Sequence, residues 1–281
     1  MSIRIITDSA SDVSPDMRED VTVLPLHLRF GDEEYLDGEN ITHEEFYKKL
    51  EESGIFPTTS QISPYEFERA IKTAKDKGEE VIIITLSSKL SGTYQSACIA
   101  AAEYEDMAYV VDSENVTIGE HTLIEYALRL KDSGMDVRKI VEELNHAKKN
   151  IRLVALLDTL EYLKKGGRVS GVVAAIGGVL AIKPVVGVVD GEVVMLGKAR
   201  GTKKGNNYLD EQISLAGGVD FSKPYYLGYT GNDDSFIRQY IEAFAHIWKK
   251  EGVELDIQSV GSAIGSHLGP GAIGVAFFSN N

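Results

Sequence analysis

Hydroxyl-bearing side chains gather in the segment TLSSKLSGTYQSA, residues 85–97, which follows the apolar run from Val81 to Leu86. A helix-like run of small residues begins directly after the hydroxyl groups. Backbone N–H groups at the start of a helix, together with serine and threonine hydroxyls, are well suited to holding an anion. The pattern therefore predicts an anion site in the loop from Ser87 to Thr93.

Further hydroxyl-rich loops occur at Thr7-Asp8-Ser9 and Asp112-Ser113, each after an apolar run, and at Thr58-Thr59-Ser60-Gln61 between two helical segments. The carboxyl ends of parallel strands share one edge of a sheet, and ligands bind there. We therefore expect these loops to converge. For any single loop, helix N-capping is an equally simple interpretation.

A glycine-rich segment near the end of the chain, GSAIGSHLGPGAIG, contains His267 in a predicted loop before an apolar strand. Glycines allow a backbone to approach a ligand closely, which favours a functional histidine, whereas an isolated histidine is often structural. The basic segments LKKGGR, with Arg168, and GKARGTKKG stand out in an acidic chain. They are either solvated surface or a site that recognises a phosphate or an acidic partner.

The elements that must position these residues alternate between strand and helix up to about residue 150. The predicted strands are continuous apolar runs, as expected when both faces of a sheet are covered. Two helices begin with a capping box, Thr42 with Glu45 and Ser63 with Glu66. The expected strands are 3–6, 81–86 and 107–113, and the expected helices are 42–54, 63–78, 92–103, 117–134 and 136–150.

The pattern changes after residue 150. Asp190-Gly191 separates two alternating apolar runs, which is a strong hairpin signal and implies antiparallel pairing. A helix is expected from Asp234 to Gly252. The predicted fold class is therefore α/β, with a doubly wound parallel-sheet domain over residues 1–150 and an α+β domain with a mainly antiparallel sheet over residues 151–281.

The composition and the missing motifs narrow the possible functions. The 281-residue chain has a formal charge of -14, which makes nucleic acid or an anionic membrane surface an unfavourable partner. The single Cys98 excludes an internal disulfide, and we expect neither a signal segment nor an integral membrane segment, hence a cytoplasmic protein. Phosphate-binding, dinucleotide-binding, serine-hydrolase and zinc motifs are missing from the sequence, so no metal and no cofactor are expected.

The chain resembles the DegV family. The matching segments are TDSASD, PTTSQISP, LSSKLSGTYQSA, VDS, LEYLKKGGRVS, IKPVV, GKARG and IGSHLGPGAIG, in the family's order and over nearly the whole chain. The resemblance implies two α/β domains with one long-chain fatty acid in a tunnel between them. It also implies that Thr59 and Ser91 hold the carboxylate and that His267 joins them, with Ser60, Gly92, Thr93 and Arg168 in support.

The resemblance further implies a carrier subunit without catalysis of its own. Related proteins present the fatty acid to a separate ATP-binding kinase subunit, which makes an acyl phosphate for phospholipid synthesis. The alternatives are a serine hydrolase using Ser91 and His267, a stand-alone phosphotransferase, and a regulatory protein that senses lipid. The apolar segment Ser170–Val189, with Gly177 and Gly178, is the expected lining for the acyl tail.

Overall fold

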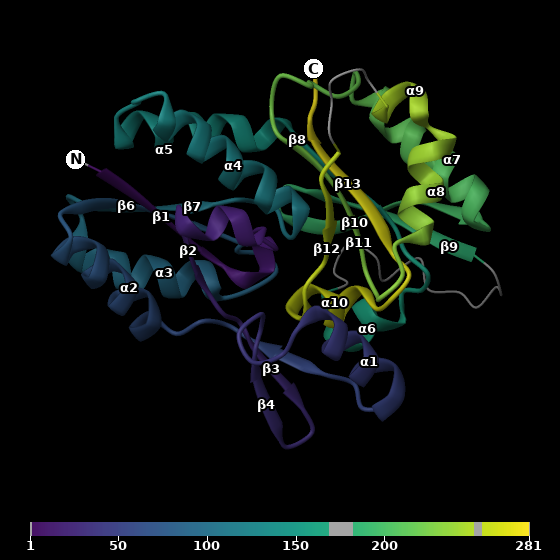
Figure 1. The fold of residues 1–281 in the computed structure, drawn as a ribbon, viewed down its shortest axis with the longest axis horizontal. Helices are drawn as coiled ribbons and strands as arrows, with labels where there is room; N and C mark the ends of the chain where they lie inside the picture. Colours follow the sequence, from purple (N-terminus) through teal and green to yellow (C-terminus); the bar gives the residue numbers. More distant parts are fainter. Residues whose placement is uncertain (1, 169–181, 250–254, 281) are drawn as a thin grey trace.

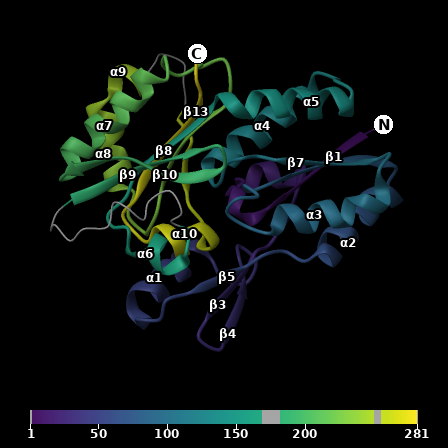
Figure 2. The same cartoon turned by 180° about the vertical axis from the view of Figure 1, so that it is seen from behind.

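A computed structural model describes residues 2–168, 182–249 and 255–280. Its first sheet is entirely parallel, in the order β2-β1-β6-β7. Two helices cover each face of this sheet (Figures 1 and 2). The strands are β1 (Ser2–Asp8), β2 (Val21–Leu24), β6 (Glu79–Thr85) and β7 (Ala108–Asp112), and the helices are α2 (Pro64–Asp76), α3 (Thr93–Ala101), α4 (Ile118–Asp132) and α5 (Val137–Ala147).

Alternate side chains of the parallel strands enter different cores. Ile6 of β1 packs with Phe67 of α2 in one cluster, whereas Ile5 packs with Ile124 and Ile140 of α4 and α5 in the other. Burial on both faces explains why these strands are uniformly apolar in the sequence. The capping box predicted at Ser63 is present and fixes the start of α2.

The second sheet has the order β10-β9-β8-β13-β11-β12, and β11 with β12 is its one parallel pair among the described residues. The predicted hairpin is confirmed, since Asp190 and Gly191 have φ angles of 49° and 81° between β9 and β10. The strands are β8 (Ile151–Leu156), β9 (Ile182–Val189), β10 (Glu192–Arg200), β11 (Tyr225–Tyr229), β12 (Ile257–Ser259) and β13 (Ile273–Phe278).

One face of this sheet packs against α7 (Thr202–Leu215), α8 (Ser235–Ala243) and α9 (Ala245–Trp248), with Trp248 fully buried. The single helix expected from Asp234 is thus broken at Phe244. Near the other face lie α10 (Ser262–Leu268) and α6 (Glu161–Gly166), seen below the sheet in Figure 1. The predicted fold class, a doubly wound parallel sheet plus a mainly antiparallel α+β unit, is confirmed.

A third, small sheet was not predicted. Its order is β4-β3-β5, all antiparallel, and it projects at the bottom of Figure 1 beside α1 (His43–Ser53). The strands are β3 (His27–Phe30), β4 (Glu33–Leu36) and β5 (Thr58–Ser60). The expected loop at Thr58–Gln61 is therefore partly wrong, because its first three residues pair with β3. In the part of the chain that the structure describes, no helix has the length and apolarity needed to cross a bilayer.

Candidate functional site

Thr59 and His267 meet although they lie far apart in the sequence. Thr59 is held in β5 by its pairing with Leu28 of β3. His267 lies in the last turn of α10, so the predicted loop location for this residue is wrong. The Oγ1 atom of Thr59 and the Nε2 atom of His267 are 3.0 Å apart and form a hydrogen bond.

Ser91 lies at the start of α3, in the loop that follows β6. Its Oγ atom is 2.9 Å from Thr93 Oγ1 and accepts a hydrogen bond from the Thr93 backbone N–H at 3.2 Å. The helix-capping interpretation therefore holds in part for Ser91. Gly92 is the N-cap residue of α3, and Thr93 is buried in its first turn.

Arg168 brings a guanidinium group to the same place. Its Nη1 group donates to the Gly166 carbonyl at 2.7 Å, and its Nε group donates to the Leu90 carbonyl at 3.3 Å. The backbone of Gly166 also packs against the histidine ring, since a Cβ atom at this position would lie 2.1 Å from His267 Nδ1. The close approach fixes both Arg168 and His267 relative to α6.

These side chains surround a cavity, here called the polar cavity. It brings together residues from both halves of the chain and from the small sheet. Five predicted site residues line it: Thr59, Ser60, Ser91, Arg168 and His267. Gly92 and Thr93 are not among the lining residues, although Thr93 hydrogen-bonds to Ser91. The other lining residues are Leu26, Gln61, Leu86, Leu90, Val116, Leu163, Val193, Ala263, Ile264 and Leu268.

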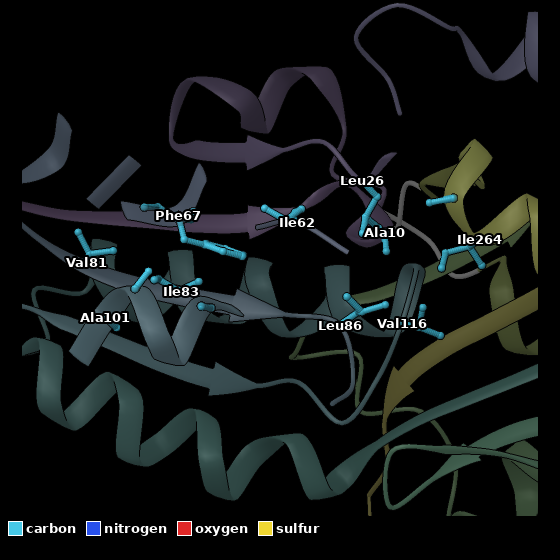
Figure 3. Close-up of a cluster of buried hydrophobic side chains, with 14 of the residues drawn as sticks. Ala10, Leu26, Ile62, Phe67, Val81, Ile83, Leu86, Ala101, Val116 and Ile264 are labelled. Atoms are coloured by element: carbon cyan, nitrogen blue, oxygen red, sulfur yellow. The ribbon is translucent and has the colours of Figure 1, made fainter. Parts of the chain in front are cut away.

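A second cavity, here called the apolar cavity, adjoins the first. The two cavities share four of their lining residues, Val116, Val193, Ile264 and Leu268. Figure 3 shows Val116 and Ile264 close to Leu26 and Leu86, although the four come from separate segments. The polar cavity and the apolar cavity are therefore neighbours that share part of their walls.

The apolar cavity lies over the second sheet. Ala155, Gly274 and Gly228 occupy one row across β8, β13 and β11, and all three line the cavity. Ile118 at the start of α4 packs closely over this row, since a Cβ atom at Gly228 would lie 3.0 Å from its side chain. Of the predicted tail lining, Val186, Gly187 and Val188 do line the cavity, whereas residues 169–181 lie outside the described residues.

The histidine at this site is neutral near pH 7. Burial, together with the nearby positive charge of Arg168, lowers the pKa of His267 to about 4. Its Nδ1 atom is buried without a hydrogen-bond partner. Positive charge at the polar cavity therefore comes from Arg168, and His267 acts as a hydrogen-bonding group.

The remaining hydroxyl loops converge on the sheet edge, as expected, but they do not line the polar cavity. Asp8 accepts hydrogen bonds from the backbone N–H groups of Leu86 and Ala10 at 2.9 and 3.1 Å. Asp112 accepts from Ser88 N–H at 3.2 Å. These loops fix the path of the segment that presents Ser91.

Sequence reasoning missed the contribution of α10 as a wall of both cavities. Ala263, Ile264, His267 and Leu268 recur at the spacing of one helix face, and this periodicity was the available signal. The abundance of glycine in the segment instead favoured a loop. Among the described residues, no group of three or more His, Cys, Asp or Glu side chains is arranged to hold a metal ion.

Comparison with known proteins defines the class. The sequence profile described as "Uncharacterised protein, DegV family" matches residues 2–280. A DegV domain-containing protein of Clostridium perfringens is 36% identical over 273 residues, 95% of either chain. The chain therefore belongs to the DegV family.

Solved structures of the family show the same fold. The fatty-acid-binding DegV family protein of Thermus thermophilus superposes with a TM-score of 0.88 at 32% identity, covering 99% of this chain and 100% of its own. A stearic-acid-binding protein of Eubacterium ventriosum gives a TM-score of 0.84 at 28% identity, covering 99% of this chain and 98% of its own.

Proposed function

We propose that this chain binds one long-chain fatty acid, with the carboxylate in the polar cavity and the acyl chain in the apolar cavity. The observation that supports this most strongly is the adjacency of a cavity lined by Thr59, Ser91, His267 and Arg168 with one lined almost wholly by apolar side chains. The fatty acids named for related structures have the same two parts. The tunnel would lie between the units 1–150 and 151–281.

Simple energetics support such a ligand. Burial of each methylene contributes about 0.8 kcal/mol, so an acyl chain of about 16 carbons gains on the order of 10 kcal/mol before ordering and association costs. A buried carboxylate without donors would cost several kcal/mol. Hydroxyl groups of Thr59 and Ser91, and the Arg168 guanidinium, are suitable donors at this site.

The same donors suit a carrier better than a hydrolase. A serine nucleophile needs a base within hydrogen-bond reach. Here the His267 Nε2 atom bonds to Thr59, and Ser91 bonds to Thr93. We propose that the chain holds the carboxylate without a covalent bond and presents it to a separate ATP-binding kinase subunit in the cytoplasm, which forms the acyl phosphate.

Lipid extraction tests the binding proposal. The purified chain is denatured and extracted with organic solvent, and the extract is analysed by mass spectrometry. We expect a long-chain fatty acid in near-stoichiometric amount. If delipidated protein also fails to bind added stearic acid, the binding proposal is wrong.

A hydroxamate assay tests the carrier role. Stearic acid, ATP and hydroxylamine are incubated with the chain, with or without a bacterial fatty acid kinase ATP-binding subunit. We expect hydroxamate when both proteins are present and none from either protein alone. Acyl phosphate formed by this chain alone would show a phosphotransferase, and fluorophosphonate labelling that is lost in Ser91→Ala would show a hydrolase.

A further inference from the structure

Helix α10 begins without a capping side chain of its own, because its N-cap residue is Gly261. The first N–H groups of a helix have no partner inside the helix and need acceptors from elsewhere. The Gly261 N–H donates to Asp12 Oδ1 at 2.8 Å, over a separation of 249 residues. The Ser262 N–H donates to Asp37 Oδ1 at 3.1 Å, over 225 residues, and the Ser262 hydroxyl bonds to the same oxygen.

The two acidic side chains are themselves held in place. Asp37 and Asp12 are 4% and 8% exposed. Asp37 Oδ2 accepts a hydrogen bond from Ser9 Oγ at 2.7 Å, and Asp12 Oδ2 accepts one from the Thr117 hydroxyl. Hydrogen bonds to both oxygen atoms make each carboxyl group a fixed acceptor.

Gly261 allows this contact. A Cβ atom at this position would lie 2.8 Å from Asp12 Oδ1 and 2.9 Å from His43 Nε2. The backbone of Gly261, with φ -71° and ψ 178°, is open to any residue, so the close approach rather than the conformation requires glycine. The N-cap position, which ordinarily carries a capping side chain, is therefore a glycine, and this leaves room for the carboxyl group of Asp12.

The Asp12 and Asp37 contacts are linked to the acid-binding residues through short connections. The other end of the seven-residue helix α10 holds His267 against Thr59. Asp37 also donates its backbone N–H to the carbonyl of Leu26, which lines the polar cavity. Movement of the first turn of α10 would therefore move both the histidine and the cavity wall.

We propose that Asp12 and Asp37 are positioning residues for the acid-binding site, because they cap α10 and thereby hold His267 beside Thr59. The inference rests on the proposed fatty acid binding. It adds a role for two acidic residues that do not touch the polar cavity. Their function in this account is to set the geometry of donors for the carboxylate, not to bind it.

The role of Asp37 is tested by comparing the affinities for two ligands that have the same alkyl chain but different head groups. Dissociation constants for stearic acid and octadecan-1-ol are measured with wild type, Asp37→Ala and Asp37→Asn. Loss of one well-placed hydrogen-bond donor to a charged group lowers affinity roughly tenfold or more. Because Asp37→Ala should displace His267, we expect it to weaken stearic acid binding by about that factor. The alcohol, which has no carboxylate, should be affected far less, and Asp37→Asn should restore most of the loss because its amide oxygen can accept from Ser262.

A matched control separates positioning from general helix capping. Asp136 caps α5 by accepting from the Arg138 N–H at 3.0 Å, away from both cavities. Asp136→Ala should leave the ratio of acid to alcohol affinity at the wild-type value. An equal loss for both ligands in Asp37→Ala, or no loss for either, would overturn the proposal.

A second measurement needs no ligand. The pKa of His267 is followed by NMR in the free wild type, in Asp37→Ala and in the milder variant Ser262→Ala. We expect it to rise toward the ordinary value when α10 shifts, and an unchanged pKa in both variants would overturn the positioning role. Wild-type protein that binds no stearic acid would refute the proposed function, whereas the His267 result decides the positioning role separately.

Discussion

His267 is the residue whose charge state responds most directly to an occupied site. In the free protein, burial and the charge of Arg168 lower its pKa to about 4. A carboxylate held beside the ring favours the protonated form. We expect the pKa of His267, followed by NMR, to rise when stearic acid is added, with the exposed His246 as an internal reference. A pKa that stays at the free value in saturated protein would show that the carboxylate binds elsewhere.

Thr59 and Ser91 are the proposed hydroxyl donors, and each can be changed with little effect on volume. A hydrogen bond to a charged group contributes about 1.5–3 kcal/mol, so Thr59→Val or Ser91→Ala should weaken stearic acid binding roughly 10- to 100-fold. Isothermal titration with delipidated protein measures the change. Thr73→Val, on the exposed surface of α2, is the matched control. Wild-type affinity in both site variants would remove these two residues from the site.

At the scale of elements, β10 contributes Val193, whose side chain lines both cavities. A larger side chain at this position should block the passage of a long acyl chain. We expect Val193→Phe to weaken binding of stearic acid strongly and binding of hexanoic acid, whose short chain has less need of the apolar cavity, much less. Val189→Phe, in the same hairpin at a position that is 49% exposed, is the control. An equal change for the two acids would show that the cavities are not used together.

Local signals in the sequence predicted the elements well. Thr42 with Glu45 and Ser63 with Glu66 form capping boxes, and both are present because the partners lie three residues apart. The hairpin at Asp190 depends on the same short-range chemistry. The small three-stranded sheet was missed because its strands have only three or four residues each, too short for a periodic pattern.

The site was predictable in its residues but not in its geometry. Thr59, Ser91 and His267 carried recognisable chemistry, and the resemblance grouped them. The Thr59–His267 contact spans 208 residues, and nothing local to either residue specifies it. The caps that Asp12 and Asp37 provide for α10 were not predicted either, because these residues lie 249 and 225 positions away from the helix start. The N-cap residue itself, Gly261, has no side chain that could have signalled a cap.

At the scale of the whole molecule, buried acidic groups make stability depend on pH. Burial raises the pKa of Asp8 from its ordinary 3.8 to about 7, although hydrogen bonds from Leu86 and Ala10 oppose the shift. Between about pH 4 and 7 the folded chain therefore retains a proton that the unfolded chain has lost, so the free energy of unfolding falls as pH rises. Burial lowers the pKa of His121 and His267 to about 4, which has the opposite effect below about pH 6.5.

The variant Asp8→Asn separates these contributions. It removes the Asp8 contribution, and its amide oxygen can still accept from Leu86. The contributions of the histidines remain, as do those of Asp12 and Glu120, whose pKa values burial also raises. We expect the free energy of unfolding, measured by urea denaturation, to rise more steeply from about pH 4 to 6.5 than in the wild type. Parallel pH profiles for the two proteins would show that Asp8 does not titrate in this range.

The central claim concerns how the two adjoining cavities are occupied. A crystal structure of the chain with stearic acid tests it most directly. The account predicts one continuous ligand, with the carboxylate within hydrogen-bond distance of Thr59 and Ser91 and the acyl chain over Ala155, Gly274 and Gly228. Stearic acid bound outside these cavities, or with its carboxylate away from both hydroxyls, would contradict it.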